Sequence, residues 1–226
     1  MKPDIEKLCK KIGYSFNDNS LLLEALTHRS VGALNNERLE FLGDSVLNFV
    51  VAEQLFMRLP KASEGDLSRL RASVVKKESL VEIAKSLELG DYISLGSGEL
   101  KSGGFRRESI LADAVEAIIG AVLRSSGFDD CQQLILRLCK DKIDQTIVDG
   151  PEKDAKTLLQ EYLQSRRYRL PEYTVVDISG KAHQQSFSVE CHIKELEIQT
   201  SGYGRSRRIA EQEAAKKAIE SIELTN

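Results

Sequence analysis

The chain has 226 residues, of which 41% are hydrophobic and 30% are charged. That length suits one large domain or two small ones, and the composition is typical of a folded protein rather than a disordered one. The 32 basic and 35 acidic residues give a net charge of -3, which argues weakly against a protein that binds nucleic acid through its overall charge.

Membrane insertion and secretion are not expected. No run approaches 18 consecutive apolar residues, and residues 1–6 lack the apolar core of a signal peptide. None of the four cysteines forms a C-x-x-C pair; they are Cys9, Cys131, Cys139 and Cys191. Cys131 and Cys139 are eight residues apart with no histidine nearby, which argues against a zinc site. We therefore expect a cytoplasmic chain without a membrane partner, with reduced and mostly buried thiols.

The first 148 residues show one helical pattern after another. Helices are expected over residues 20–29 with Ser20 as N-cap, then over 37–58, 63–75, 77–88, 106–125 and 129–147. Between them, residues 96–104 are rich in glycine and are expected to form a loop. This part of the sequence predicts no strand.

The pattern breaks at residues 149–154, where a Gly-Pro pair and four charges predict a linker. The following segment favours a helix over 154–165 and strands over 173–178 and 187–193. A shorter alternation at 196–200 and a helix over 206–222 complete it. This α-β-β-β-α order predicts three antiparallel strands with helices on one face.

Two helical segments carry unusual acidic stripes. Glu37, Glu40 and Asp44 are spaced i, i+3, i+7, which places all three carboxylates on one face of a helix. Residues 110–123 contain only two charges, Asp113 and Glu116, in an otherwise apolar run typical of a buried helix. Buried carboxylates without a basic neighbour need compensation from elsewhere.

Three interpretations of these stripes remain open from the residues alone. They could be solvated helix faces, or they could form buried ion pairs with distant Arg or Lys residues. They could also face each other and share divalent cations. Hard oxygen ligands suit Mg²⁺, and such sites serve phosphoryl chemistry.

Residues 36–45, Asn-Glu-Arg-Leu-Glu-Phe-Leu-Gly-Asp-Ser, resemble the signature motif of the ribonuclease III family. Residues 103–117 resemble the second acidic motif of that family, and residues 26–30 and 64–66 also match it. The resemblance covers the whole chain and is greatest to the short bacterial form. It implies an all-α endonuclease domain at residues 1–148, a linker at 149–153 and a small α+β double-stranded-RNA-binding domain at 154–226.

The resemblance also implies roles for the acidic residues. Metal ligands are expected at Glu40, Asp44, Asp113 and Glu116, with Asp44 and Glu116 the most essential to catalysis. Glu37 and Glu64 are expected to lie in the same acidic valley and to help engage substrate. Phe41 is similar to the residue that inserts into a partner subunit, which implies a homodimer; the alternative is an ordinary core aromatic.

Three regions of the second domain resemble the RNA contacts of its family. Gln160 and Glu161 are expected to reach ribose hydroxyls in one minor groove, and His183 to enter the next. Basic residues that open the last helix are expected to contact phosphates across the major groove; they are Arg205, Arg207 and Arg208. Glu211 stands where the general family pattern has a further basic residue, so modest and salt-sensitive binding is expected.

The resemblance implies a Mg²⁺-dependent endoribonuclease specific for double-stranded RNA, with Mn²⁺ as a plausible substitute. A metal-activated water would leave 5′-phosphate and 3′-hydroxyl ends with short 3′ overhangs, on substrates such as ribosomal RNA precursors and structured messenger RNAs. Two alternatives are a non-catalytic RNA-binding scaffold and a helical phosphohydrolase that acts on mononucleotides.

The net charge is unevenly distributed along the chain. Residues 1–150 hold 20 basic and 23 acidic residues, whereas residues 151–226 hold 12 of each. All of the -3 therefore lies in the part that carries the acidic stripes. The net charge therefore does not exclude nucleic-acid binding, because the basic residues of the second domain need only cluster on one face.

Overall fold

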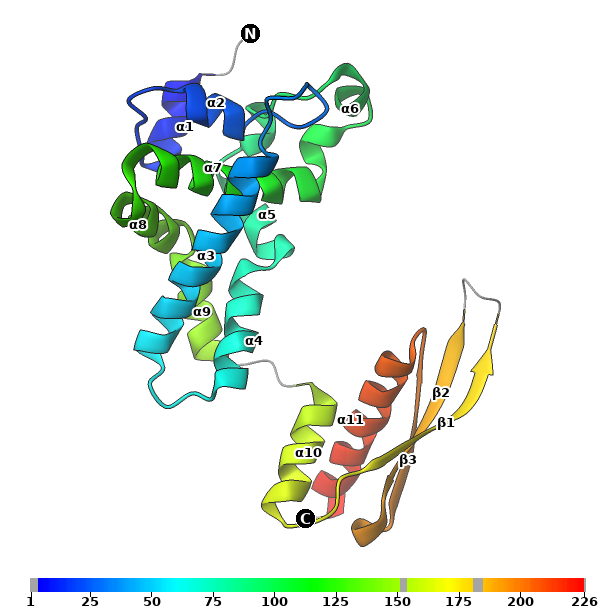
Figure 1. Cartoon of the computed structure of the whole chain (residues 1–226). Coiled ribbons are helices and arrows are strands. Elements are labelled where there is room, and N and C mark those ends of the chain that lie inside the picture. Colours follow the sequence, from blue (N-terminus) through cyan, green and yellow to red (C-terminus); the bar gives the residue numbers. More distant parts are fainter. Residues whose placement is uncertain (1–3, 151–153, 181–184, 226) are drawn as a thin grey trace. The chain divides into compact units, whose positions relative to one another are not determined.

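The computed structural model describes residues 4–150, 154–180 and 185–225 (Figure 1). The chain divides into two compact units, Met1–Glu152 and Lys153–Asn226. Among the described residues, no helix is long and apolar enough to cross a membrane.

The first unit is helical. Its α-helices are α1 (Ile5–Ile12), α2 (Ser20–Ala25), α3 (Glu37–Arg58), α4 (Glu64–Val75), α5 (Lys77–Ser86), α6 (Ser97–Lys101), α7 (Glu108–Ser126), α8 (Phe128–Leu138) and α9 (Lys140–Asp149). Short 3₁₀ turns lie at Leu89–Asp91 and Gly104–Arg106. Local signals fix several of the helix starts. The Ser63 hydroxyl, for example, accepts a hydrogen bond from the amide of Asp66 at 3.1 Å and caps α4.

Helix α7 is the centre of this unit, and α3 crosses it (Figure 1). Eleven of its 19 residues are buried, including Val115, Ile118 and Val122. The apolar side chains of α3, α5 and α8 pack around it in one continuous core. An all-round apolar helix thus takes the central position that its sequence predicts.

The structure corrects several expected boundaries. Helix α1 was not predicted, and α2 has Asn19 rather than Ser20 as its N-cap. The helix expected over 20–29 ends at Ala25, because Leu26 and His28 form backbone hydrogen bonds with Ser94 instead. The resulting parallel bridge between Thr27 and Ser94 is a strand-like pairing that the sequence did not predict.

Two further differences concern the second half of this unit. The single helix expected over 129–147 is two helices, α8 and α9, divided at Cys139. The glycine-rich segment 96–104 is not only a loop, because it contains the short helix α6. All four cysteines are free and buried, as predicted.

The second unit has the predicted α-β-β-β-α order. Its elements are α10 (Ala155–Ser165), β1 (Glu172–Ser179), β2 (Ser186–Ile193), β3 (Ile198–Gly204) and α11 (Arg207–Thr225). The strands form an antiparallel sheet in the order β1-β2-β3, and both helices cover one face of it (Figure 1). The predicted strand start at Leu196 is wrong, since Leu196 closes a 3₁₀ turn and Glu197 takes a left-handed φ of 53° before β3 begins.

Glycines allow β3 to lie directly against α11. A Cβ at Gly202 would be 2.1 Å from the carbonyl oxygen of Ala210, a distance that no packed side chain tolerates. Leu159, Cys191 and Ala214 are fully buried between the sheet and the helices. This close approach fixes where the N-terminal turn of α11, with its arginines, stands on the surface of the unit.

Candidate functional site

The site of interest lies where α3 crosses α7. The two helices touch through glycine: a Cβ at Gly43 would be 1.8 Å from the carbonyl oxygen of Glu116, and one at Gly120 would be 2.1 Å from that of Leu39. Any larger side chain would force the helices apart. This contact brings the acidic stripe of one helix against the acidic pair of the other.

Three carboxylates meet at the crossing. Glu40 from α3 and Asp113 and Glu116 from α7 each offer an oxygen atom, and these atoms all lie within 4.8 Å of one another. Asp44, one turn further along α3, lies close enough for its charge to act on Glu116. The side-chain amide of Asn48 donates to Asp44 Oδ1 at 2.8 Å and holds that carboxylate in place.

Burial raises the pKa values of Glu40, Asp113 and Glu116, and neighbouring carboxylates add to the effect at Glu40 and Glu116. The pKa of Glu116 rises to about 8, mainly through burial and then through the charges of Asp44, Glu40 and Asp113. Burial likewise raises the pKa of Glu40, with further contributions from Asp113 and Glu37. Burial also raises the pKa of Asp113, although His28 and Arg29 oppose it. Such mutual destabilisation is relieved when a cation binds.

Protein cations do not neutralise this cluster. Within the described parts of the chain, neither Glu40, Asp113 nor Glu116 forms an ion pair. The guanidinium of Arg29, whose charge acts on Glu40 and Asp113, pairs instead with Glu37 at 3.3 Å. Glu40, Asp113 and Glu116 are half-buried, whereas the carboxylates of a solvated helix face would be exposed. Of the three interpretations, a shared divalent cation is the one that this geometry supports, and all-carboxylate donors suit Mg²⁺.

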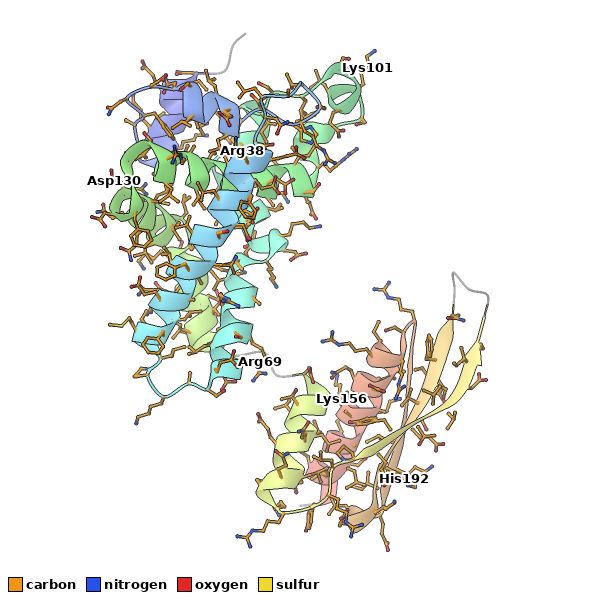
Figure 2. The ribbon with its side chains drawn as sticks, viewed as in Figure 1. Arg38, Arg69, Lys101, Asp130, Lys156 and His192 are labelled. Atoms are coloured by element: carbon orange, nitrogen blue, oxygen red, sulfur yellow. The ribbon has the colours of Figure 1, made fainter. Side chains whose placement is uncertain are left out.

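Access to the cluster is through a hollow of about 480 Å³. Glu40 and Asp113 line it together with Glu37, His28 and Arg107. Arg38, labelled in Figure 2, lines a separate hollow with Phe41. The hollow at the cluster is open enough to admit a phosphodiester beside the carboxylates.

Glu64 is not part of this cluster. It opens α4 and lines a different hollow of about 310 Å³, together with Phe49, Phe56 and Leu67. Its carboxylate accepts a hydrogen bond from the Ser68 hydroxyl at 2.8 Å. Within one chain, Glu64 is therefore separated from the carboxylates at the helix crossing.

An apolar stripe runs along the exposed side of α3. Phe41, Phe49 and Phe56 are 76%, 56% and 66% exposed, and their spacings of eight and seven residues place them on one face of the helix. Phe41 is thus not a core aromatic in this chain. An exposed row of three aromatic rings is typical of a protein–protein interface.

The side chains that the sequence predicts to contact RNA lie in the second unit, and those that the structure describes are exposed. Gln160 and Glu161 are exposed on α10, Arg205 precedes α11, and Arg207 and Arg208 open that helix with exposed side chains. The Ser206 hydroxyl accepts a hydrogen bond from the amide of Ile209 at 3.3 Å and caps the helix. His183 lies outside the described residues.

Some residues that shape the two sites were missed from the sequence. Gly43 and Gly120 set the helix crossing, and their only signal is a small residue on each of two strongly apolar helices. Asn48 could have been found from its i, i+4 spacing to Asp44. Lys156 gives no such signal, because its partner Glu211 is distant in the sequence.

Comparisons with known proteins agree with both units. Residues 18–142 match the family model described as ribonuclease-III-like, and residues 155–222 match the double-stranded RNA binding motif. The protein called Ribonuclease 3 of Marinomonas sp. is 59% identical over 96% of both chains. That of Vibrio cholerae is 50% identical over 100% of both.

Among solved structures, the nuclease domain of ribonuclease III from Campylobacter jejuni matches with a TM-score of 0.60. It is 49% identical, and the match covers 62% of this chain and 98% of that one. The fold and the acidic site thus define a helical nuclease joined to a double-stranded-RNA-binding domain. The chain belongs to the ribonuclease III family, the endoribonucleases specific for double-stranded RNA.

Proposed function

We propose that the chain hydrolyses double-stranded RNA with Mg²⁺ held at the crossing of α3 and α7. The observation that carries this proposal is the cluster of Glu40, Asp113 and Glu116, whose oxygen atoms lie within 4.8 Å without a cationic partner among the described residues. Mn²⁺ also suits an all-oxygen site and is expected to substitute. The products would be 5′-phosphate and 3′-hydroxyl ends.

The proposed metal ligands are Glu40, Asp44, Asp113 and Glu116. When bound, the cation supplies positive charge to the phosphate and lowers the pKa of a coordinated water. Asn48 would hold the Asp44 carboxylate in place through its hydrogen bond to Oδ1. Glu37, paired with Arg29 at the rim of the hollow, is proposed to help engage the substrate.

We further propose that the exposed stripe on α3 is the interface of a homodimer. The nuclease domain from Campylobacter jejuni is described as structurally flexible in a region involved in dimer formation. In this chain, Phe41, Phe49 and Phe56 supply an apolar face that a second copy would cover. Glu64 lies against Phe49 and Phe56, so the same interface would bring it toward a site on the partner. Paired active sites would cut both strands and leave short 3′ overhangs.

The second unit is proposed to hold the duplex. Gln160 and Glu161 would face one minor groove, while Arg205, Arg207 and Arg208 would face the phosphates. His183 is proposed for the next minor groove on its sequence position alone. We divide the chain into a nuclease domain at 1–148, a linker at 149–153 and an RNA-binding domain at 154–226.

Ribosomal RNA precursors and structured messenger RNAs are the proposed substrates, and the cytoplasm is the proposed location. Four free, buried thiols support a reducing compartment. Shape-based recognition of a duplex supports substrates defined by structure rather than by a short sequence.

The test compares a long RNA duplex, a single strand and a mononucleotide, each with and without Mg²⁺. We expect only the duplex to be cut, only with the metal, and the products to carry 5′-phosphates that a phosphatase removes. Glu116→Ala should abolish cleavage while duplex binding stays measurable. Cleavage by that variant, or turnover of the mononucleotide, would contradict the proposal.

A further inference from the structure

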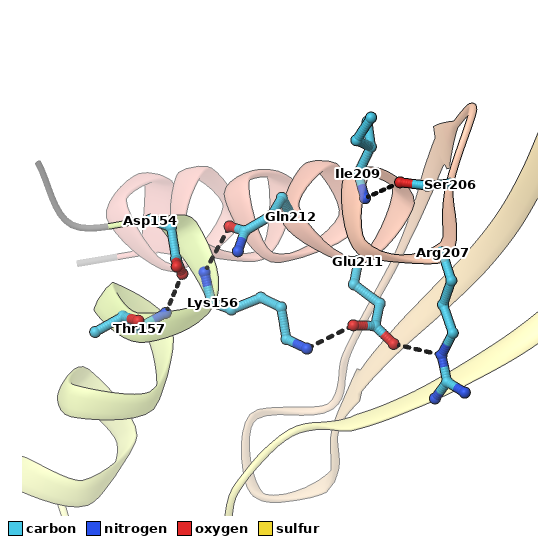
Figure 3. Close-up of polar contacts among 8 residues, drawn as sticks. All are labelled: Asp154, Lys156, Thr157, Ser206, Arg207, Ile209, Glu211 and Gln212. Atoms are coloured by element: carbon cyan, nitrogen blue, oxygen red, sulfur yellow. Dashed lines mark hydrogen bonds and ion pairs between the residues drawn. The ribbon is translucent and has the colours of Figure 1, made fainter. Parts of the chain in front are cut away.

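Glu211 carries a negative charge in a buried position of the second unit. The residue is only 8% exposed, and its carboxylate forms ion pairs with two basic side chains at once (Figure 3). One oxygen accepts a hydrogen bond from Lys156 Nζ at 2.6 Å, and the other accepts one from Arg207 Nε at 2.8 Å. These bonds hold the pKa of Glu211 below its usual range despite its burial. A buried carboxylate of this kind is stable only with such partners.

The ion pair ties three elements of the unit together. Lys156 belongs to α10, and its ammonium also lies 4.5 Å from the ring centroid of Tyr173 on β1. Its backbone amide donates to the Gln212 side chain of α11 at 3.1 Å. Glu211 therefore sits at the junction of α10, α11 and β1, where small movements would shift the first turn of α11.

Arg207 uses only one of its donors in this contact. Its Nε–H points at Glu211, whereas the two η nitrogens lie on the side away from the carboxylate (Figure 3). The side chain is 63% exposed, so these nitrogens face solvent. A guanidinium is a planar fork, and fixing Nε fixes the direction of the remaining donors.

We propose that Glu211 is a positioning residue for RNA binding. By holding Arg207 through Nε, it presents the η nitrogens to a phosphate of the duplex and removes rotamer freedom that binding would otherwise have to remove. The inference rests on the proposed contact between Arg207 and RNA, which it deepens. Lys156 neutralises the same carboxylate. The group formed by Lys156, Glu211 and Arg207 therefore keeps a net positive charge toward the phosphate.

A positioning role for Glu211 and a purely electrostatic role predict opposite changes in RNA affinity when the residue is neutralised. If Glu211 acted only through its negative charge, its neutralisation would strengthen binding to a polyanion. If it positions Arg207, the neutral Glu211→Gln variant should bind more weakly although it is more positive. The sign of the change in Kd therefore distinguishes the two.

The experiment uses the full chain, without divalent metal to prevent cleavage, and a fluorescein-labelled RNA duplex longer than the ~16 base pairs that one such domain spans. We expect Glu211→Gln to raise the Kd on the order of fivefold, as for the loss of one charge-assisted contact. The slope of log Kd against log salt concentration should fall by about 0.9, the value for one phosphate contact on duplex DNA. Loss of a structural contact alone would leave that slope unchanged.

Glu213→Gln is the matched control. Glu213 lies on the same helix and forms an i, i+4 ion pair with Lys217 at 2.9 Å, but neither residue of that pair is a proposed RNA contact. The control removes the same charge and should not weaken binding. Arg207→Ala should weaken binding as much as Glu211→Gln does, and the double variant should bind no more weakly than Arg207→Ala.

The outcomes separate the two proposals. Unchanged or tighter binding by Glu211→Gln would overturn the positioning role, whereas unchanged binding by Arg207→Ala would overturn the RNA contact itself. Circular dichroism checks the fold of each variant. Should Glu211→Gln unfold, Glu211→Asp keeps the charge but is too short to reach both Lys156 and Arg207. It should also bind more weakly, and unchanged affinity for that variant would contradict the proposal.

Discussion

Gly43 on α3 and Gly120 on α7 face each other at the point where the two helices cross. A Cβ built on Gly43 would lie 3.0 Å from the amide nitrogen of Gly120, and one on Gly120 would lie 3.2 Å from that of Gly43. The backbones are therefore in direct contact. Glu40 and Glu116 stand within about one turn of this point on their helices, so the same contact sets the distance between the carboxylates.

Gly120→Ala is expected to disturb both the fold and the site. The new methyl group would overlap the Leu39 carbonyl, at 2.1 Å, and the helices would have to separate. Overpacking of this kind costs about 1–3 kcal/mol, which urea unfolding should measure. Mg²⁺ binding, followed by calorimetry, should weaken as the carboxylates move apart.

Gly98→Ala is the control for the change of residue type. Gly98 lies in the short helix α6, and a Cβ there would meet nothing within 4 Å. Alanine favours a helix by about 1 kcal/mol over glycine, so this variant should be as stable as the original chain or slightly more so. Equal stability of Gly120→Ala and Gly98→Ala would contradict the role given to the crossing.

The fold class could be predicted from the sequence because the patterns that indicate helices and strands are local. The all-round apolar run of α7 and the alternation in β2 each depend on neighbouring residues only, and both elements lie where they were expected. The boundaries that failed depend on distant contacts. Helix α2 ends early because Leu26 and His28 bond to Ser94, which is more than 60 residues away.

The candidate site was partly predictable for the same reason. The i, i+3, i+7 spacing places Glu37, Glu40 and Asp44 on one face from sequence alone. That α3 and α7 touch, and how closely, depends on Gly43 and Gly120, which carry no chemical signal by themselves. The position of Glu64 beside Phe49 and Phe56, away from the cluster, is a property of tertiary packing that no spacing encodes.

Phe41→Asp is expected to weaken the proposed homodimer. Phe41 is 76% exposed in the single chain, and a charge in a buried interface loses its hydration. Removing an aromatic anchor of an interface costs about 2 kcal/mol or more, which corresponds to a rise of roughly 30-fold in the dimer Kd. Sedimentation equilibrium measures this change.

Val148→Asp is the matched control for Phe41→Asp. Val148 is 84% exposed on α9 and is not one of the aromatic residues of the stripe on α3, and the same charge is introduced there. The dimer Kd of this variant should stay unchanged. Equal effects of the two substitutions would show that the charge, and not the position on the stripe, is responsible.

The buried thiols are expected to resist alkylation. Burial raises the pKa of Cys131 to about 11 and that of Cys139 to about 12, and the reactive species is the thiolate. Iodoacetamide at neutral pH should therefore modify the folded chain slowly and the denatured chain at all four cysteines. Mass spectrometry counts the modified residues, and rapid modification of Cys139 in the folded chain would contradict its buried position.

Glu116→Gln is expected to change the pH dependence of stability in the metal-free protein. The folded state raises the pKa of Glu116 to about 8 from 4.5, so between these values it holds a proton that the unfolded chain releases. The free energy of unfolding therefore includes the whole contribution of this group when the pH is below its pKa in the unfolded chain. That contribution is lost as the pH rises toward 8. Glutamine cannot ionise and avoids that loss. In a chelator, the two proteins should have similar Tm values near pH 5, and the variant should have the higher Tm near pH 9.

Added Mg²⁺ should reverse this difference. A cation between Glu40, Asp113 and Glu116 relieves the repulsion, so it should raise the Tm of the original chain near pH 9 more than that of the variant, which lacks one ligand. Glu108→Gln, at an exposed position in the first turn of α7, controls for the change in net charge. A Tm difference that is the same at both pH values would contradict the raised pKa, while an equal gain from Mg²⁺ in both proteins would place the cation elsewhere.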